Sequence, residues 1–271
     1  MHKLYKSGQD FLADNNGILA DFPLETVFFE LNAKRIENTD KNDFLIKLQC
    51  GNGYLLAVHC SSKPLVLFGD VALCAEFARV AFEEKLTFNK VLGAKETCEI
   101  FLSEYRRFTG ARFEINRAMD IMQCRQTETD DVCGVERATE KDLNEIAELA
   151  ALFENEAFGE SDVKDYKQKL QGIIRDFAFI RRDGKIVSLA AKVRENQSLC
   201  AISWVYTLPR YRNNGLSRRV VTHLTKSVLN DGKLPYLFVD KNNPISNHLY
   251  TKIGYTYAAP QYEYKLIGIE A

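Results

Sequence analysis

The sequence predicts an α/β protein of two domains. Runs of β-branched and aromatic residues, which are typical of strands, alternate along the chain with segments whose apolar residues recur at helical spacing. A short polar and acidic stretch without either periodicity, Gln126–Gly134, divides the chain near its middle. The 271 residues, 46% of them hydrophobic, suffice for two buried cores. We therefore expect an N-terminal α/β domain over residues 1–126, a linker over 127–134 and a second domain over 135–271.

Composition narrows the class of partner. Thirty-six basic and 37 acidic side chains give a formal net charge of −1, so we expect neither a nucleic-acid nor a membrane partner. The longest apolar runs fall far short of a membrane span, and the first residues do not resemble a signal peptide, which favours a cytoplasmic protein. The seven cysteines are scattered without a CxxC pair, and the four histidines are dispersed. This pattern predicts reduced, mostly buried thiols and no metal site.

The first half begins with two helical patterns between Phe11 and Glu37, separated at Asp21–Pro23. Three strands follow, with a hairpin turn at Gly51–Gly53 because Gly and Asn tolerate positive φ. These strands are expected at Asp43–Cys50, Tyr54–Cys60 and Leu65–Phe68. Further along we expect a helix at Asp70–Leu86, a strand at Phe88–Leu92, a helix at Lys95–Phe108 and a strand at Phe113–Cys124.

The second half opens with a short strand from Val135 that runs into a helix. Thr139 and Asp142 have the spacing of a capping box at the start of that helix. Its apolar stripe consists of Leu143, Ile146, Leu149 and Leu152. The other expected elements are a helix at Ser161–Arg175 with Ser161 as its N-cap, a hairpin of Ala178–Arg182 and Lys185–Val193 about the turn Asp183-Gly184, and closing strands at Tyr255–Ala258 and Gln261–Ile267.

A strand, a basic turn and a helix follow one another in the second half of the chain, and this order indicates function. A strand is expected at Cys200–Thr207 and a helix at Leu216–Asn230. The first turn of a helix has free N–H groups and the positive end of the dipole, which favours phosphate binding. Gly215 and Ser217 are small enough to let a pyrophosphate approach the backbone. Three arginines would add charge-assisted contacts: Arg212, Arg218 and Arg219. The GxGxxG fingerprint and the GxxxxGK[ST] loop do not occur in the sequence.

A second strand, at Pro235–Asp240, leads into another motif, and the two blocks together resemble the acyl-CoA-binding core of the GNAT family of N-acetyltransferases. Arg212–Ser217 matches the [RQ]-x-x-G-x-[GA] pyrophosphate loop, with Ser in the last small position. Asn243–Tyr255 matches the segment N-x-x-[AS]-x-x-L-Y-x-K-x-G-[FY]. The resemblance covers about half of the chain, from near Val135 to the C-terminus. It implies a GNAT-like mixed, mostly antiparallel sheet flanked by helices, preceded by a second, smaller α/β domain.

The resemblance also implies a function and a site. The protein would be an N-acyltransferase with acetyl-CoA, or a related acyl-CoA, as its acyl donor. The matching cofactor positions are Val205, Tyr206 and Thr207 for the pantetheine arm, and Arg212, Asn213, Asn214, Gly215, Leu216, Ser217 and Arg218 for the pyrophosphate. Asn243 either bonds the pantetheine amides or caps the helix at Ser246, a residue that is assigned to the same site. Tyr250 takes the catalytic role, because a phenol can protonate the thiolate that an attacking amine expels.

The general base is where the sequence departs from the family. Many relatives carry a glutamate near the position of Ala201, which cannot accept a proton. Substitutes by position only are Asp240, Glu156 and Glu160, each of which also fits a solvated surface carboxylate. His248 could titrate near neutral pH, but its place on a helix favours exposure. Trp204 and Tyr206 fit either the acceptor pocket or the core.

The first half leaves two interpretations open. Its order of strands, helix, strand, helix and strand parallels the second half, which fits a degenerate GNAT-like repeat. Phe68-Gly69-Asp70 contains a glycine but no basic residue to meet a phosphate, so such a repeat would have lost the cofactor loop. A coincidental α/β order explains the same pattern.

We expect acyl transfer to an amine by direct attack in a ternary complex, because no Cys–His or Ser–His pairing can be read from the sequence. A small-molecule acceptor is expected rather than a protein, although neither its identity nor the oligomeric state follows from the fold. One alternative is a CoA-binding or sensing protein without catalysis, which Ala201 favours. Another is an aminoacyl-tRNA-dependent transferase with tandem GNAT-like domains, which should carry a broad basic surface.

Overall fold

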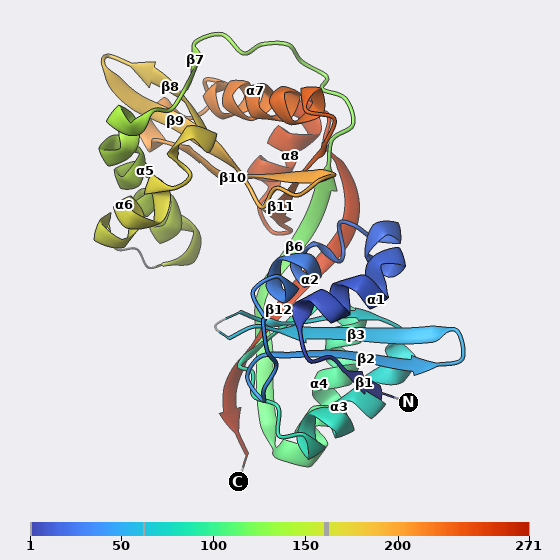
Figure 1. Ribbon diagram of the computed structural model, residues 1–271. Coiled ribbons are helices and arrows are strands. Elements are labelled where there is room, and N and C mark those ends of the chain that lie inside the picture. Colours follow the sequence, from blue (N-terminus) through green and yellow to red (C-terminus); the bar gives the residue numbers. More distant parts are fainter. Residues whose placement is uncertain (1, 62, 160–162, 271) are drawn as a thin grey trace. The chain divides into compact units, whose positions relative to one another are not determined.

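The computed structural model describes residues 2–61, 63–159 and 163–270, and the chain forms two compact units (Figure 1). The first unit comprises Met1–Ile121, Asp240–Asn242 and Ala259–Ala271, and the second comprises Met122–Val239 and Asn243–Ala258. The stretch at 127–134 that was expected to link two domains is therefore part of the second unit. Residues 259–271, which were expected in the second domain, belong to the first unit.

The first unit is a sheet with helices on both faces. Its elements in chain order are β1 (His2–Leu4), α1 (Gly8–Asp21), α2 (Val27–Ala33), β2 (Phe44–Cys50), β3 (Gly53–His59), β4 (Leu65–Gly69), the 3₁₀ turn η1 (Val71–Leu73), α3 (Cys74–Glu83), β5 (Lys90–Gly93), α4 (Lys95–Thr109), most of β6 (Ala111–Gln123) and most of β12 (Thr256–Ile269). The strands lie in the order β1-β2-β3-β4-β5-β12-β6. β4 and β5 run parallel, whereas β1–β2, β2–β3, β3–β4 and β5–β12 are antiparallel pairs.

Alternate residues of these strands face two different cores. Leu56 and Val58 of β3 pack with Phe11 of α1 and Phe29 of α2. Leu55 and Ala57, their neighbours in sequence, pack instead with α3 and α4 in a core that includes Phe77 and Phe101. Since successive side chains of a strand point to opposite faces, the two helix pairs cover the two faces of the sheet, as Figure 1 shows.

The second unit contains both predicted motifs. Its elements in chain order are β7 (Val135–Arg137), the 3₁₀ turn η2 (Glu140–Asp142), α5 (Leu143–Phe158), α6 (Val163–Gln171), the turn η3 (Ile174–Asp176), β8 (Phe177–Arg182), β9 (Lys185–Val193), β10 (Leu199–Thr207), the turn η4 (Pro209–Tyr211), α7 (Leu216–Asn230), β11 (Leu234–Asp240) and α8 (Pro244–Ile253). The strands lie in the order β11-β10-β9-β8-β7. Only β10 and β11 run parallel among these described pairs, and β7–β8, β8–β9 and β9–β10 are antiparallel.

This unit also has a core on each face of its sheet. Ala178 and Ile180 of β8 pack with α7 and α8, whereas Phe177 and Phe179 pack with α5 and α6. The expected capping box is present, because the side chain of Thr139 receives the N–H of Asp142 and the Asp142 carboxylate receives the N–H of Thr139. The predicted fold class, a mixed and mostly antiparallel sheet flanked by helices, is confirmed.

Three local expectations need correction or fall outside the described chain. Leu152 was expected in the buried stripe of its helix but is 45% exposed. The two expected closing strands form one strand, β12. It continues on both sides of Pro260, although proline cannot donate a ladder hydrogen bond. Ser161 lies outside the described residues, and the described part of its expected helix is α6 followed by η3.

In the described part of the chain, none of the helices combines the length and the apolar character that a bilayer crossing requires.

Candidate functional site

The second unit places the two predicted motifs where two parallel strands part. β10 pairs with β11 at Leu199–Ala201, opposite Leu234–Tyr236, and within the described chain the ladder goes no further. β10 nevertheless continues to Thr207 and β11 to Asp240. The carboxyl-terminal parts of both strands therefore carry backbone groups that do not bond to each other, and α7 and α8 begin just beyond them. Ligands of open α/β sheets bind at this end of parallel strands.

A β-bulge in β10 turns its later side chains to the opposite faces of the sheet. Cys200 and Ile202 pack in the α7/α8 core, and strict alternation would place Trp204 there as well. Trp204 has a positive φ of 57°, and the register with β9 shifts between Ser203 and Tyr206. Its ring consequently lies in the α5/α6 core, and Val205 faces the α7/α8 core instead.

The predicted pyrophosphate loop has the backbone shape that its glycine allows. Asn213 and Gly215 both have positive φ, at 64° and 69°, and Gly215 is the N-cap of α7. A Cβ atom at Gly215 would meet its nearest neighbour, the Arg218 Nη2 atom, only at 3.9 Å. The Asn214 side-chain amide donates to the carbonyl oxygens of Tyr211 and Arg212, at 3.2 and 3.0 Å. These two hydrogen bonds within the loop stabilise its conformation.

The first turn of α7 is not capped by any side chain that the structure describes, and it contains no acidic residue. Its N–H groups and the positive end of the helix dipole are therefore available to an anion. Leu216, the first helical residue, is buried, and Ser217 is half-buried. α8 differs, because the Asn243 side chain accepts the N–H of Ser246 at 3.0 Å. Of the two roles left open for Asn243, the structure shows the helix cap.

Two of the three arginines near the loop are paired with carboxylates. Arg212 donates through Nε to the carbonyl oxygen of Thr207 at 3.0 Å and through Nη2 to Glu156 of α5 at 2.7 Å. Arg219 donates through Nε to Asp131 at 2.8 Å, and this hydrogen bond lowers the pKa of the Asp131 carboxyl. The third, Arg218, buries an Nε atom that has no hydrogen-bond partner among the described residues.

Tyr250 lies in the same apolar cluster as Val205, so the structure brings the predicted acid and the predicted pantetheine strand into one core. Its side chain is 7% exposed, and its ring packs edge-on against Tyr255 at 6.0 Å between centroids. Burial raises the pKa of the Tyr250 phenol well above its usual value near 10. A tyrosine is already protonated at neutral pH, and burial extends this protonated state to higher pH.

The chain is similar to one family model and to several solved structures. Residues 180–264 match the family model described as "FR47-like protein". A solved acetyltransferase of the GNAT family from Colwellia psychrerythraea aligns over 98% of both chains, with a TM-score of 0.62 and 13% identity. A tandem GNAT protein from the clavulanic acid biosynthesis pathway aligns over 100% of both chains, with a TM-score of 0.54 and 10% identity.

The chain has a GNAT fold. A Drosophila protein solved by a structural genomics consortium also shares this architecture, at a TM-score of 0.65 and 14% identity over 97% of this chain and 98% of that one. Among curated proteins, none matches the sequence. Because the tandem GNAT protein aligns along the whole chain, the GNAT-like arrangement extends to the first half. The predicted resemblance is confirmed at the level of the fold.

The first GNAT-like unit differs from the second at its parallel strand pair and at the helical segment that follows. Its parallel strands pair at Leu65–Val66, opposite Val91–Leu92, and remain close where β5 ends, since a Cβ atom at Gly93 would lie 2.8 Å from the carbonyl oxygen of Leu67 in β4. The helical segment after β4 begins with a carboxylate, because Asp70 accepts the N–H of Ala72 at 2.9 Å. A negative side chain thus occupies the place where the second unit leaves free N–H groups.

The described substitutes for the missing GNAT glutamate are surface carboxylates with other bonds. Ala201 is fully buried in the paired part of β10. Glu156 is exposed and holds Arg212, whereas Asp240 is grouped with the first unit and accepts the N–H of Asn242 at 2.8 Å. Glu160 lies outside the described residues. His248 is exposed.

Two residues that the sequence did not single out form a chain of contacts to Trp204. Lys169 of α6 places its ammonium nitrogen 5.3 Å from the Trp204 ring centroid and 3.9 Å from Glu154 of α5. Trp204 and Tyr206 are 8% and 7% exposed, so both rings are largely buried. No sequence signal joins these residues, because they come from two helices and a bulged strand.

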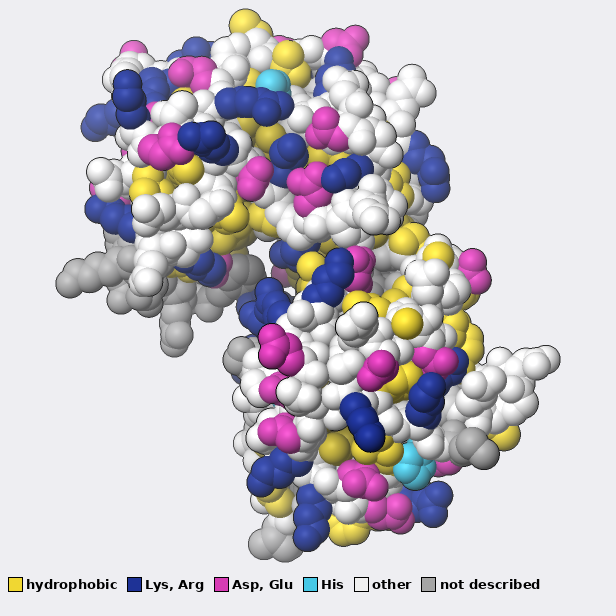
Figure 2. Space-filling model, in the orientation of Figure 1, with side chains coloured by type: hydrophobic (Ala, Val, Ile, Leu, Met, Phe, Trp, Pro, Cys, Tyr) yellow, Lys and Arg dark blue, Asp and Glu magenta, His cyan; other side chains and the backbone are white. Residues whose placement is uncertain are grey.

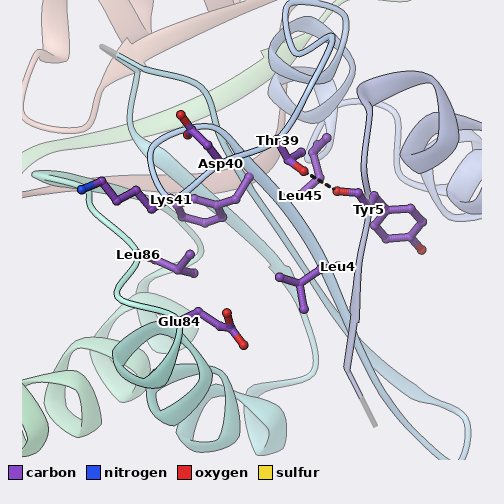
Figure 3. A pocket seen from close by; sticks show the side chains of 9 residues that line it. Leu4, Tyr5, Thr39, Asp40, Lys41, Leu45, Glu84 and Leu86 are labelled. Atoms are coloured by element: carbon purple, nitrogen blue, oxygen red, sulfur yellow. Dashed lines mark hydrogen bonds between the residues drawn. The ribbon is translucent and has the colours of Figure 1, made fainter.

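A hollow of about 180 Å³ in the first unit contains none of the predicted site residues. Figure 3 shows it between β1, the segment before β2 and the end of α3, with the Thr39 hydroxyl donating to the carbonyl oxygen of Tyr5 at 2.9 Å. Within residues 2–61, 63–159 and 163–270, His, Cys, Asp and Glu side chains form no group of three or more that could hold a metal ion.

Proposed function

We propose that the chain is an acyl-CoA-dependent N-acyltransferase that transfers an acetyl group from acetyl-CoA to an amine. The observation that carries this proposal is the parting of β10 from β11 directly before the uncapped first turn of α7. An extended thioester ligand needs unpaired strand backbone, and its pyrophosphate needs an anion site a few residues further on. The second unit supplies both in the order that the GNAT resemblance requires.

In this proposal the donor follows the chain from β10 into α7. The backbone of Val205, Tyr206 and Thr207 binds the amides of the pantetheine arm, since these residues lie beyond the ladder with β11. The loop from Arg212 to Arg218 binds the pyrophosphate through the free N–H groups of α7, with the dipole and the arginine side chains opposing its charge. Asn243 and Ser246 lie at the start of α8, which follows β11, and are proposed to contact the same donor.

The chemistry follows from one buried phenol. A neutral amine attacks the thioester carbonyl carbon, so that a C–N bond forms and the C–S bond breaks. The departing thiolate takes the proton of the Tyr250 hydroxyl, and the amine gives up a proton to water. We propose direct attack in a ternary complex, in which the described residues need not form a covalent intermediate. The first unit is not expected to bind the donor, because Asp70 opposes phosphate binding there.

The test is calorimetric titration of acetyl-CoA into the full chain and into a matched pair of variants. Ser217→Glu adds a carboxylate to the first turn of α7, whereas Ser217→Gln adds the same volume without charge. A carboxylate at this end of a helix favours helix formation, so lost binding would not result from unfolding. We expect Ser217→Glu to weaken acetyl-CoA binding at least about tenfold relative to Ser217→Gln. Equal affinities of the two variants would show that α7 does not hold the pyrophosphate. If the native chain did not bind acetyl-CoA, acetyl-CoA could not be its acyl donor.

A CoA-binding or sensing protein without catalysis is the second candidate, favoured by the buried Ala201 where relatives carry a base. An amine panel separates it from the enzyme, because a sensor binds acetyl-CoA but acylates none of the amines. The tRNA-dependent alternative gains no support from the face drawn in Figure 2, where basic and acidic side chains are interspersed. All seven cysteines are free thiols, which supports a reducing, cytoplasmic setting.

A further inference from the structure

A lysine ammonium group lies against two aromatic rings and a carboxylate on the α5/α6 side of β10. The Lys169 nitrogen is 5.3 Å from the ring centroid of Trp204 and 5.0 Å from that of Tyr166. The two rings meet edge to face, with centroids 5.7 Å apart and planes at 85°. Glu154 closes a third side, with its Oε1 atom 3.9 Å from the ammonium nitrogen.

This arrangement has the chemistry of a cation site. Aromatic faces carry negative electrostatic potential and attract ammonium groups within about 6 Å of the ring centroid. The Glu154 side chain is only 19% exposed, so its charge is poorly solvated and gains from a nearby cation. The Lys169 side chain is 57% exposed, which leaves one side of its ammonium group open to solvent. An incoming cation could therefore reach the rings if Lys169 swung away.

The bulge in β10 places the site beside the strand that is proposed to hold the acyl donor, on the opposite face of the sheet from Tyr250. It turns the Trp204 ring toward α5 and α6, and it leaves Val205, the next residue, facing the α7/α8 core that contains Tyr250. A group bound against Trp204 is thus one residue along the strand from the backbone that is proposed to hold the acyl donor. Phe153 of α5 adds an apolar wall, with its ring centroid 5.8 Å from that of Trp204.

We propose that Trp204, Tyr166 and Glu154 bind an aliphatic primary ammonium group of the acceptor, and that Lys169 is an internal competitor which the acceptor displaces. Lys169 is itself a primary ammonium on an alkyl chain, so the structure shows that this group fits the rings and the carboxylate together. An anionic acceptor would be repelled by Glu154, and a neutral one would lack the electrostatic attraction of a cation to the ring faces. The assignment to an acceptor rests on the proposed function, whereas the ammonium site stands on its own geometry.

The chain's only tryptophan provides the readout, because Trp204 emission reports directly on a cation placed against its ring. The full chain is titrated with n-butylammonium chloride, and 1-butanol serves as the uncharged probe of similar shape. Lys169→Ala removes the competitor, and Lys167→Ala removes an exposed lysine from the same helix with the same change in net charge. We expect the apparent dissociation constant for n-butylammonium to fall at least about tenfold in Lys169→Ala and to stay unchanged in Lys167→Ala.

The carboxylate is tested in the background that opens the site. Lys169→Ala with Glu154→Gln should lose the gain in affinity, and 1-butanol should leave the emission of Lys169→Ala unchanged. An equal response to butanol and butylammonium, an affinity in Lys169→Ala that equals the native one, or a double variant that keeps the gain would overturn the proposal. If Lys169→Ala fails to fold by circular dichroism, Lys169→Gln replaces it, since its amide removes the charge and keeps most of the side chain.

This experiment contains no acyl-CoA, so its outcome is independent of the proposed transfer. If butylammonium binds as expected but acetyl-CoA does not bind, the ammonium site stands and the acyltransferase proposal falls. If acetyl-CoA binds but butylammonium does not change the Trp204 emission of Lys169→Ala, only the ammonium site is refuted.

Discussion

Alkaline unfolding of the second unit should reveal how deeply Tyr250 is buried. The perturbation is Tyr250→Phe, which removes the hydroxyl and keeps the ring in the core. Burial raises the pKa of the Tyr250 phenol, so the folded chain keeps this proton at pH values where the unfolded chain, with a pKa near 10, has lost it. A group whose folded pKa is raised contributes stability that is complete below pH 10 and is lost as pH rises above it.

The magnitude follows from the unfolded phenol alone. At pH 11 an unfolded tyrosine with a pKa near 10 gains about 1.4 kcal/mol from ionisation, which the folded protein cannot match. Between pH 8 and pH 11 the free energy of unfolding should therefore fall by about 1.4 kcal/mol more in the native chain than in Tyr250→Phe. The pKa of Tyr255 is raised by burial as well, and its contribution is common to both proteins.

The assay is urea unfolding at the two pH values, followed by the emission of Trp204, which reports on the second unit. Tyr257→Phe is the matched control, because it removes a phenol of the same unit that is 57% exposed. It should leave the difference between the two pH values unchanged. If Tyr250→Phe loses as much stability as the native chain between pH 8 and pH 11, the Tyr250 phenol ionises in the folded state, and its pKa is not raised by burial.

Three further predictions concern the proposed site and its supports. Tyr250→Phe should lower the turnover number about 10²- to 10⁴-fold while the dissociation constant for acetyl-CoA, measured by calorimetry, stays the same; weakened binding would assign Tyr250 to the donor pocket instead. Glu156→Gln should tighten acetyl-CoA binding about two- to fivefold, since it frees Arg212 from an exposed ion pair, and weaker binding would mean that the pair positions the loop. Gly93→Ala should destabilise the first unit by about 1–3 kcal/mol in urea unfolding followed by circular dichroism, because its Cβ atom would lie 2.8 Å from a backbone oxygen. Unchanged acetyl-CoA affinity is the control for that variant, and unchanged stability would show that β4 and β5 can separate.

Local patterns were sufficient to predict most elements, including the strand, turn and helix that contain the first motif. α7 spans Leu216–Asn230, the range that its apolar periodicity and its stop signal predict, and the capping box at Thr139 forms as expected. Motifs of this kind depend on a few adjacent residues, whose backbone preferences and hydrogen bonds act over a single turn. The absence of a basic residue near Asp70 likewise predicted a first unit without a phosphate loop, and Asp70 caps its own helical turn.

The tertiary structure decided what depends on long-range pairing. β12 runs through Pro260 as one strand and places residues 259–271 in the first unit, because its ladder with β5 joins residues far apart in sequence. The bulge at Trp204 exchanges the faces of the later residues in β10, which no alternation pattern can foretell. Lys169 reaches Trp204 and Glu154 only because α5 and α6 pack on that face. The sequence by itself therefore determined the local structure of the two motifs through backbone chemistry, whereas packing between distant segments decided which side chains surround them.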